Sequence, residues 1–181
     1  MGARQGNPME LAGATTRDAH REFADVLERH RGIVLKVAGS YAANPEDRAD
    51  LAQDIAAQLW RAWPSYAPDR PVTTWMYRIA LNVAISHLRG RSLRDRHHVP
   101  YDDELHAAAS HDTAIEDEHE ASQQLRLLDR VIAALPPLDR ALMLLYLDER
   151  SQREIADVLG ISESNVSTRI SRLKQRLRDE F

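Results

Sequence analysis

The chain has 181 residues and no cysteine, with 43% hydrophobic and 29% charged residues. This length suffices for one large core or two small ones, and the lack of cysteine excludes disulfides and thiolate metal sites. No apolar run approaches the roughly 20 residues that span a bilayer, and residues 1–16 lack the apolar stretch of a signal peptide. We therefore expect a soluble, cytoplasmic protein with no membrane partner and with a flexible leader over residues 1–17.

The net charge of −4 is concentrated in one part of the chain. Residues 1–94 carry 13 Lys/Arg and 10 Asp/Glu, and residues 122–181 carry ten bases and nine acids. Residues 95–121 carry a single Arg against nine acids. Because local patches decide contact with a polyanion, two near-neutral or slightly basic blocks are compatible with nucleic-acid binding despite the acidic total.

Residues 18–94 are predicted to form an all-α domain, because apolar residues recur at three- and four-residue steps without any alternating strand pattern. The first apolar stripe runs from Phe23 to Val37 and predicts one helix. Asn44-Pro45 breaks that helix and opens a second one. The stripe of the second helix consists of Leu51, Ile55 and Leu59, backed by Ala52 and Ala56.

Three prolines between residues 64 and 71 interrupt helical structure, so this segment is predicted to be a loop. A third helix begins near Thr73 or Thr74, and Gly90 is its expected end.

Residues 95–121 combine nine acids, five histidines and no sustained apolar period. Such a composition cannot bury enough surface to offset chain entropy, which predicts a mostly disordered acidic linker. Zinc could in principle bind histidines, yet their irregular spacing argues against a metal site, and no cofactor is expected. The five are His97, His98, His106, His111 and His119.

Residues 122–181 resume the helical period and are predicted to form a second all-α domain. Pro136-Pro137 separates its first two helices. Ser151 and Glu154 have the spacing of a capping box at the start of the next helix.

The span from Ser151 to Arg178 has the pattern of a helix-turn-helix. Gly160 can adopt the left-handed conformation of the turn, and Ser162 can cap the second helix. Five bases and no acid lie between Ser164 and Arg178, which suits contact with phosphates and base edges. The residues expected to face DNA are Ser164, Asn165, Ser167, Thr168, Arg169, Arg172 and Lys174.

Aromatic, polar and basic side chains also gather from Trp75 to Arg96. Single-stranded nucleic acid requires this combination of stacking surfaces and positive charge, although the pattern alone also fits a core tryptophan beside a solvated helix end. The candidate nucleic-acid contacts are Trp75, Tyr77, Arg78, Asn82, Arg89 and Arg91.

Together and in this order, these signals resemble the extracytoplasmic-function (ECF) sigma factors of bacterial RNA polymerase. Residues 47–60 resemble the family helix that binds the clamp helices of the polymerase. Residues 66–75 resemble the loop that captures a flipped base of the −10 promoter element, and residues 75–89 resemble the helix that melts and reads that element. Residues 135–140 and 160–166 resemble the C-terminal domain that binds the −35 element.

The resemblance implies a sigma factor, not an enzyme, that directs core RNA polymerase to specific promoters and assists promoter melting. The implied partners are the beta and beta-prime subunits of the core enzyme, promoter DNA and an anti-sigma factor. The acidic linker is then expected to lie in the positively charged RNA exit path. The implied polymerase contacts are Asp50, Leu51, Gln53, Asp54, Ile55 and Trp60.

Four positions depart from the family pattern. Ala49 stands where the family usually has Glu, and Ala56 where a bulky aromatic is common; both bear on affinity for the core enzyme. Ser86 stands where Asp is typical and Ser167 where a base is typical, and both bear on promoter preference.

Three other functions remain as alternatives at this point. A conventional helix-turn-helix regulator would need only the C-terminal block. An all-α protein-binding adaptor would leave the basic final helix unexplained. An enzyme lacks support, because the sequence has no Gly-rich phosphate loop, no HExxH or GxSxG motif and no cysteine nucleophile.

Overall fold

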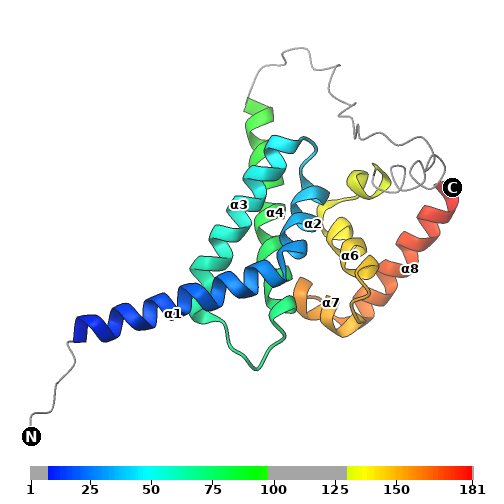
Figure 1. Ribbon diagram of the computed structural model, residues 1–181. Helices are drawn as coiled ribbons and strands as arrows, with labels where there is room; N and C mark the ends of the chain where they lie inside the picture. The colour runs from blue at the N-terminus through cyan, green and yellow to red at the C-terminus, as the bar shows by residue number, and fades with distance from the viewer. Residues whose placement is uncertain (1–7, 98–129, 181) are drawn as a thin grey trace, which may run out of the picture.

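The computed structural model describes residues 8–97 and 130–180, which form helices joined by turns and short loops (Figure 1). The N-terminal part comprises α1 (Pro8–Arg29), α2 (Arg31–Tyr41), α3 (Pro45–Ala62), a short 3₁₀ helix (Trp63–Ser65) and α4 (Val72–His97). In the C-terminal part, residues 130–134 are helical and precede α6 (Pro137–Leu147), α7 (Gln152–Leu159) and α8 (Glu163–Glu180). The all-α fold class is confirmed for the described residues.

Helix boundaries differ from the prediction in three places. Helix α1 begins at Pro8, inside the expected leader, and the chain bends at His30 (φ −113°, ψ 17°), so the first stripe is divided between α1 and α2. The bend lets Phe23 pack on Trp60 while the apolar residues of α2 face the bundle. Helix α4 continues through Gly90 to His97, the start of the acidic segment; the rest of that segment and most of its histidines lie outside the described residues.

The break predicted at Asn44-Pro45 is confirmed: Pro45 opens α3, and the Asn44 side chain caps it by accepting a hydrogen bond from the Asp47 backbone N–H at 2.7 Å. The caps predicted at Ser151 and Ser162 are also confirmed, because each depends on neighbouring residues alone. At the turn between α7 and α8, Gly160 has φ +68°, and the Ser162 hydroxyl accepts from the Asn165 N–H at 3.3 Å.

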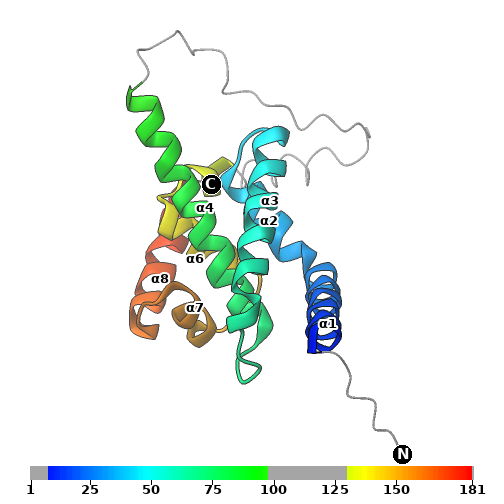
Figure 2. The same cartoon turned by 90° about the vertical axis from the view of Figure 1, so that its left-hand side faces the viewer.

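Helices α2, α3 and α4 pack against one another around a core that includes Val37, Leu51, Ile55, Leu59 and Met76, each at most 1% exposed. Helix α1 crosses this bundle only at its C-terminal end, and its N-terminal half projects from the body of the molecule (Figure 1). Figure 2 views α1 nearly end-on, to one side of α3 and α4. The three-helix bundle and the N-terminal half of α1 therefore form two separate surfaces of the molecule.

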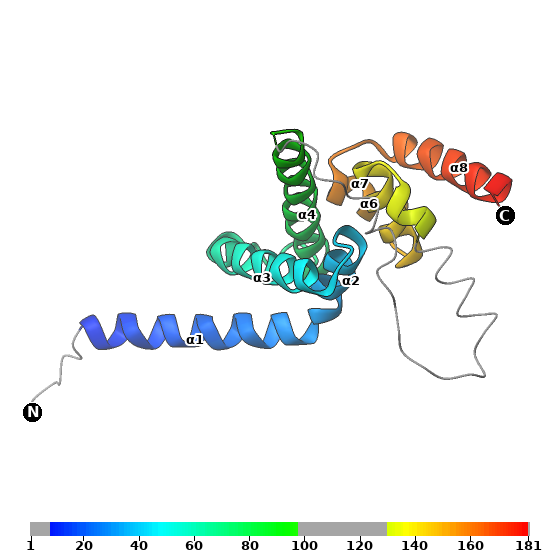
Figure 3. The same ribbon diagram turned by 90° about the horizontal axis from the view of Figure 1, so that it is seen from above.

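The two helical blocks, which the sequence predicts as separate domains, pack on one another. Helix α6 contacts α2 and α4 on one side and α7 and α8 on the other, and Figure 3 shows the C-terminal helices against this face of the bundle. All five residues from Ala141 to Leu145 are at most 5% exposed. A helix buried on consecutive positions must be covered all round, so the second block needs the first to complete its core.

Candidate nucleic-acid and polymerase interface

The outer surface of α3 carries the acidic and polar residues predicted to contact polymerase. Asp50, Gln53 and Asp54 are exposed along this helix. Leu51 and Ile55, assigned to the same contact, are fully buried between α3 and its neighbours. Their side chains position the helix from beneath and offer no surface to a partner in this conformation.

An aromatic cluster braces the loop between α3 and α4. The ring of Trp63 stacks on Tyr66 with centroids 5.3 Å apart, and both rings lie within 6 Å of Trp75. The Tyr66 hydroxyl donates to the Arg70 carbonyl at 2.8 Å, which closes the loop on itself. Trp60, half-buried, extends the cluster to Phe23. Trp75 thus supports the loop and keeps part of its ring accessible.

A groove of about 520 Å³ lies between α3 and α4. It brings Asn82, a predicted DNA contact, together with Asp54, a predicted polymerase contact. The His87 Nε2 atom is buried there without a hydrogen-bond partner. The remaining lining residues are Gln58, Arg61, Ile79, Val83 and Ser86. The groove therefore combines an apolar floor with donors and acceptors that suit a polar planar ligand such as a nucleobase.

Two further residues predicted to contact the −10 element, Tyr77 and Arg78, lie at the junction between the blocks. Tyr77 is fully buried, and its hydroxyl donates to Asp148 Oδ2 at 2.7 Å. Burial, reinforced by the hydrogen bond to Asp148, raises the pKa of Tyr77 well above its ordinary value. Arg78 donates to the Asp157 carbonyl oxygen at 2.8 Å. In this conformation Tyr77 is not accessible to DNA, whereas Arg78 is exposed and has part of its guanidinium bound to α7. Arg89 is exposed, and the Arg91 side chain lies outside the described residues.

Helices α7 and α8 form the predicted helix-turn-helix. Val166 is fully buried and Ile170 is 6% exposed, so one face of α8 anchors it on α6 and α7. The opposite face exposes Ser164, Asn165, Ser167, Thr168 and Arg172.

Two basic residues of the set on α8 have partners inside the protein. Arg169 binds Asp139 Oδ1 at 2.8 Å and Asn165 Oδ1 at 3.0 Å. The Lys174 ammonium lies over the Tyr146 ring, 4.4 Å from its centroid. Both side chains are therefore oriented before any ligand arrives, which lowers the entropic cost of binding.

Comparison with known proteins identifies the family. Residues 26–94 match the family model of sigma-70 region 2, and residues 125–177 match that of sigma-70 region 4. The chain is 33% identical over 171 residues to the ECF RNA polymerase sigma factor RpoE of Cereibacter sphaeroides, covering 90% of this chain and 89% of that protein. It is 30% identical over 174 residues to the RNA polymerase sigma factor CnrH of Cupriavidus metallidurans, covering 92% and 90%. This chain belongs to the ECF family of RNA polymerase sigma factors.

Solved structures place the same family fold in complexes. CnrH in complex with the cytosolic domain of CnrY has a TM-score of 0.60 at 25% identity, covering 88% of this chain and 87% of that one. The sigma factor RpoE in complex with the anti-sigma factor NepR from Bartonella quintana has a TM-score of 0.67 at 21% identity, covering 88% and 96%.

As an ECF sigma factor, the protein directs core RNA polymerase to promoters and binds both the polymerase and promoter DNA. Region 2 comprises α2, α3 and α4 with the aromatic-braced loop, and region 4 comprises the helix-turn-helix. Sigma factors regulate transcription initiation. Among the described helices, none is long and apolar enough to cross a membrane.

Proposed function

We propose that this sigma factor divides promoter recognition between the groove of region 2 and the exposed face of α8. The observation that carries the proposal is the groove, which Asn82 and Ser86 of α4 line together with residues of α3. Trp75, earlier on the same helix, belongs to the aromatic cluster, whose rings can stack an unpaired base. Ser86, one of the departures from the family pattern, also lines the groove, so it would alter which base is favoured.

The exposed acidic face of α3 is the proposed polymerase contact. Asp50, Gln53 and Asp54 are available, whereas Leu51 and Ile55 act by holding the helix. Ala49 is also exposed, so the missing family carboxylate would weaken the charge of this face. A rim charge chiefly affects association rate and its salt dependence. Asp50→Arg should therefore slow binding to the core enzyme.

Region 4 is proposed to bind duplex DNA of the −35 element. The exposed residues Ser164, Asn165, Ser167, Thr168 and Arg172 would reach base edges and phosphates, with Arg169 and Lys174 held in place by Asp139 and Tyr146. Ser167, where the family has a base, would lose one phosphate or base contact.

The family relationship supports three further assignments. We expect a cytoplasmic protein, because polymerase and chromosome are there, and one that performs no catalysis of its own. We also expect an anti-sigma factor as a partner, since RpoE from Bartonella quintana was solved in complex with one.

The test uses holoenzyme assembled from core polymerase and the full chain. Asn82→Ala should retain footprint protection of the upstream element but form fewer permanganate-reactive bubbles, because a base-edge contact is worth about 1–3 kcal/mol. Arg172→Ala should lose upstream protection yet act almost normally on a pre-melted template.

The matched control is Arg29→Ala, an exposed arginine of α1 far from α8 in the sequence, which should behave as wild type in both assays. An identical defect of Asn82→Ala and Arg172→Ala in both assays would disprove the division between the regions.

A further inference from the structure

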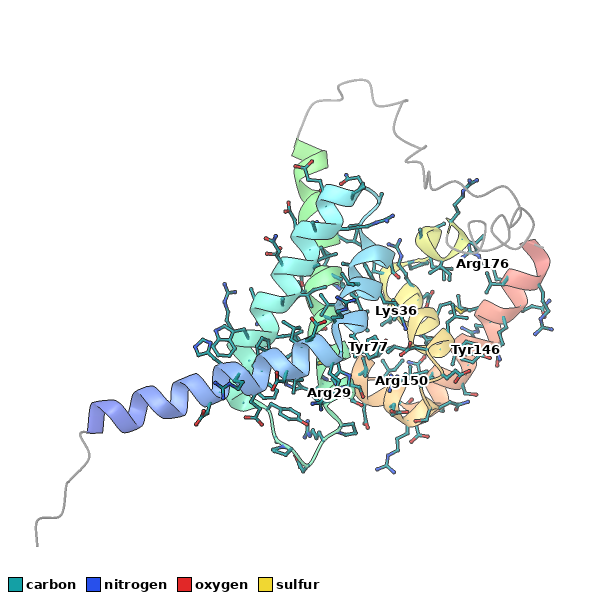
Figure 4. All side chains as sticks on the ribbon, in the orientation of Figure 1. Arg29, Lys36, Tyr77, Tyr146, Arg150 and Arg176 are labelled. Carbon is teal, nitrogen blue, oxygen red and sulfur yellow. The ribbon has the colours of Figure 1, made fainter. Side chains whose placement is uncertain are left out.

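Asp148, in the turn after α6, binds three groups from both regions at once. Its Oδ2 accepts the Tyr77 hydroxyl at 2.7 Å and the Arg150 guanidinium at 3.1 and 3.2 Å, and its Oδ1 binds the Lys36 ammonium. Lys36 and Tyr77 belong to region 2, and Arg150 belongs to region 4. Figure 4 shows these three side chains gathered where the two groups of helices meet.

The turn that carries Asp148 has a defined geometry. Glu149 has φ +56°, a left-handed conformation that is strained for a residue other than glycine. The Arg150 N–H donates to the Leu145 carbonyl at 3.1 Å, which closes the end of α6. This turn directs Asp148 and Arg150, the two neighbours of Glu149, toward the junction between the regions.

Further hydrogen bonds join region 4 to region 2 beside Asp148. The Tyr41 hydroxyl donates to the Pro137 carbonyl at 2.7 Å, and Arg140 donates to the Ser40 carbonyl at 3.1 Å. Arg78 is bound to the Asp157 carbonyl. Region 4 therefore occupies Tyr77 and Arg78, two of the residues predicted to contact the −10 element.

We propose that Asp148 is an intramolecular latch that keeps the free sigma factor closed, with region 4 masking part of the DNA-contacting face of region 2. This inference uses the proposed roles of Tyr77 and Arg78, while the latch itself concerns only the contact between the regions. Nothing in the proposal requires a second protein: the inhibitory contact lies within one chain.

The latch is reversible because its partners are charged and partly solvated. The Lys36 side chain is 46% exposed and Asp148 16%. A polyanion such as DNA attracts Lys36, Arg78 and Arg150, the same basic side chains that hold region 4 against region 2. DNA binding and closure are therefore coupled, and each must weaken the other by the same factor.

The experiment measures the distance between the regions in the full chain. The protein has no cysteine, so Ala43→Cys in region 2 and Arg153→Cys in region 4 give a unique pair of spin labels at exposed positions. The wild type should show one narrow distance distribution. Asp148→Asn should shift it to longer distances, with a roughly tenfold rise in the open-to-closed ratio, equivalent to about 1.4 kcal/mol.

Asp157→Asn is the matched control, because it removes one exposed carboxylate from region 4 while the Arg78 contact uses the Asp157 main chain. It should retain the wild-type distribution. Lys36→Gln, at a half-exposed position, provides a second variant if Asp148→Asn does not fold, and should also favour the open form. Unchanged distances in a folded Asp148→Asn or Lys36→Gln protein would overturn the latch.

Binding of a fluorescent single-stranded DNA of random sequence to the free protein tests the masking. Asp148→Asn should bind about tenfold more tightly than wild type, and opening without this gain would overturn the inhibitory role. Transcription by the holoenzyme separates the two proposals. If Asn82→Ala melts promoters as well as wild type does, the proposed −10 contact is refuted, whereas the distance measurement still decides whether the latch exists.

Discussion

At the scale of single residues, Ser151 and Glu154 fix the start of the helix-turn-helix. The Ser151 N–H donates to Glu154 Oε2 at 2.9 Å, and the Glu154 N–H donates to Ser151 Oγ at 3.2 Å. The hydrogen bond from the Ser151 backbone, with a further one from its hydroxyl, lowers the pKa of the Glu154 carboxyl. The half of the cap that the Glu154 carboxylate supplies is therefore strongest while Glu154 is ionised, whereas the bond to Ser151 Oγ does not depend on its charge.

Ser151→Ala should lower the free energy of unfolding by about 1 kcal/mol, as expected for the loss of a helix cap. Because the pKa of Glu154 is lower in the folded than in the unfolded chain, its ionisation adds to the free energy of unfolding above the unfolded pKa near 4.3, and this contribution is lost as pH falls through the folded pKa. Glu154→Gln should therefore make the free energy of unfolding depend less on pH in the acid range. Urea unfolding at pH 7 and below pH 4 measures both. Gln152→Ala, exposed and outside the box, should match wild type within a few tenths of a kcal/mol.

Residue-scale prediction from the sequence succeeded where partners are close in the chain. The capping box and the Gly160 turn involve neighbours within three or four residues, so their spacing is visible in the sequence. The bridge between Asp139 and Arg169 spans 30 residues, and the contact between Tyr77 and Asp148 spans 71. Nothing local marks such pairs, so the sequence predicted a DNA contact for Tyr77 and did not reveal its hydrogen bond to Asp148.

At the scale of helices, glycine is required by the backbone conformation at one position and is not required at two others. Gly160 ends α7 with φ +68°, where a side chain is strained whatever the surrounding space. Gly32 and Gly39 lie within α2, and a Cβ added at either would meet nothing within 4 Å. Glycine lowers helix stability relative to alanine, so α2 is less stable than its length allows.

Gly160→Ala should destabilise the protein by about 1 kcal/mol, the cost of the left-handed conformation for an L-residue. Gly32→Ala and Gly39→Ala should each stabilise it by about 0.5–1 kcal/mol. Thermal unfolding followed by circular dichroism compares the three variants. A gain of stability for Gly160→Ala would mean that the turn does not require positive φ.

Helix existence was easier to predict than helix ends. The apolar period identified α3, α4 and the helix-turn-helix because it repeats over many residues. The end predicted at Gly90 was wrong because Leu88 still packs on the core and helical hydrogen bonding continues to His97. The bend at His30 interrupts a period that continues unchanged in the sequence, so the stripe alone could not reveal it.

At the scale of the whole molecule, both buried tyrosines of the junction report on closure. Burial raises the pKa of Tyr41 and of Tyr77 above the ordinary value near 10. Arg140 opposes this shift at Tyr41, whereas at Tyr77 the Asp148 carboxylate reinforces it and Arg150 opposes it. The unfolded or opened chain binds fewer protons at high pH, so closure loses stability as pH rises above about 10.

Alkaline titration followed by ultraviolet absorbance should therefore show the ionisation of Tyr41 and Tyr77 displaced above the ordinary tyrosine value in the wild type. Asp148→Asn should move the Tyr77 transition toward the ordinary value. Tyr146→Phe, which removes a half-buried tyrosine of region 4, should leave both late transitions in place. Simultaneous ionisation of all tyrosines in the native wild type would contradict the buried junction.

The association of the two regions was the main feature that the sequence did not reveal. The break in composition after residue 94 predicts two separate domains, and the same break suggested that few contacts join them. Apolar residues on α6 satisfy a helical pattern whether they face α8 or α2, so the pattern cannot say how many partners the helix has.

Helix α6 reaches its place only after region 2 has been made. On the ribosome, roughly 40 residues separate the end of α4 from the start of α6, which at about 5–20 residues per second takes about 2–8 s. During that interval Tyr41 and Tyr77 have no cover, and the latch residue has not been synthesised. For a few seconds during synthesis, each molecule therefore has region 2 without region 4, and its junction surface stays uncovered until translation produces α6 and Asp148.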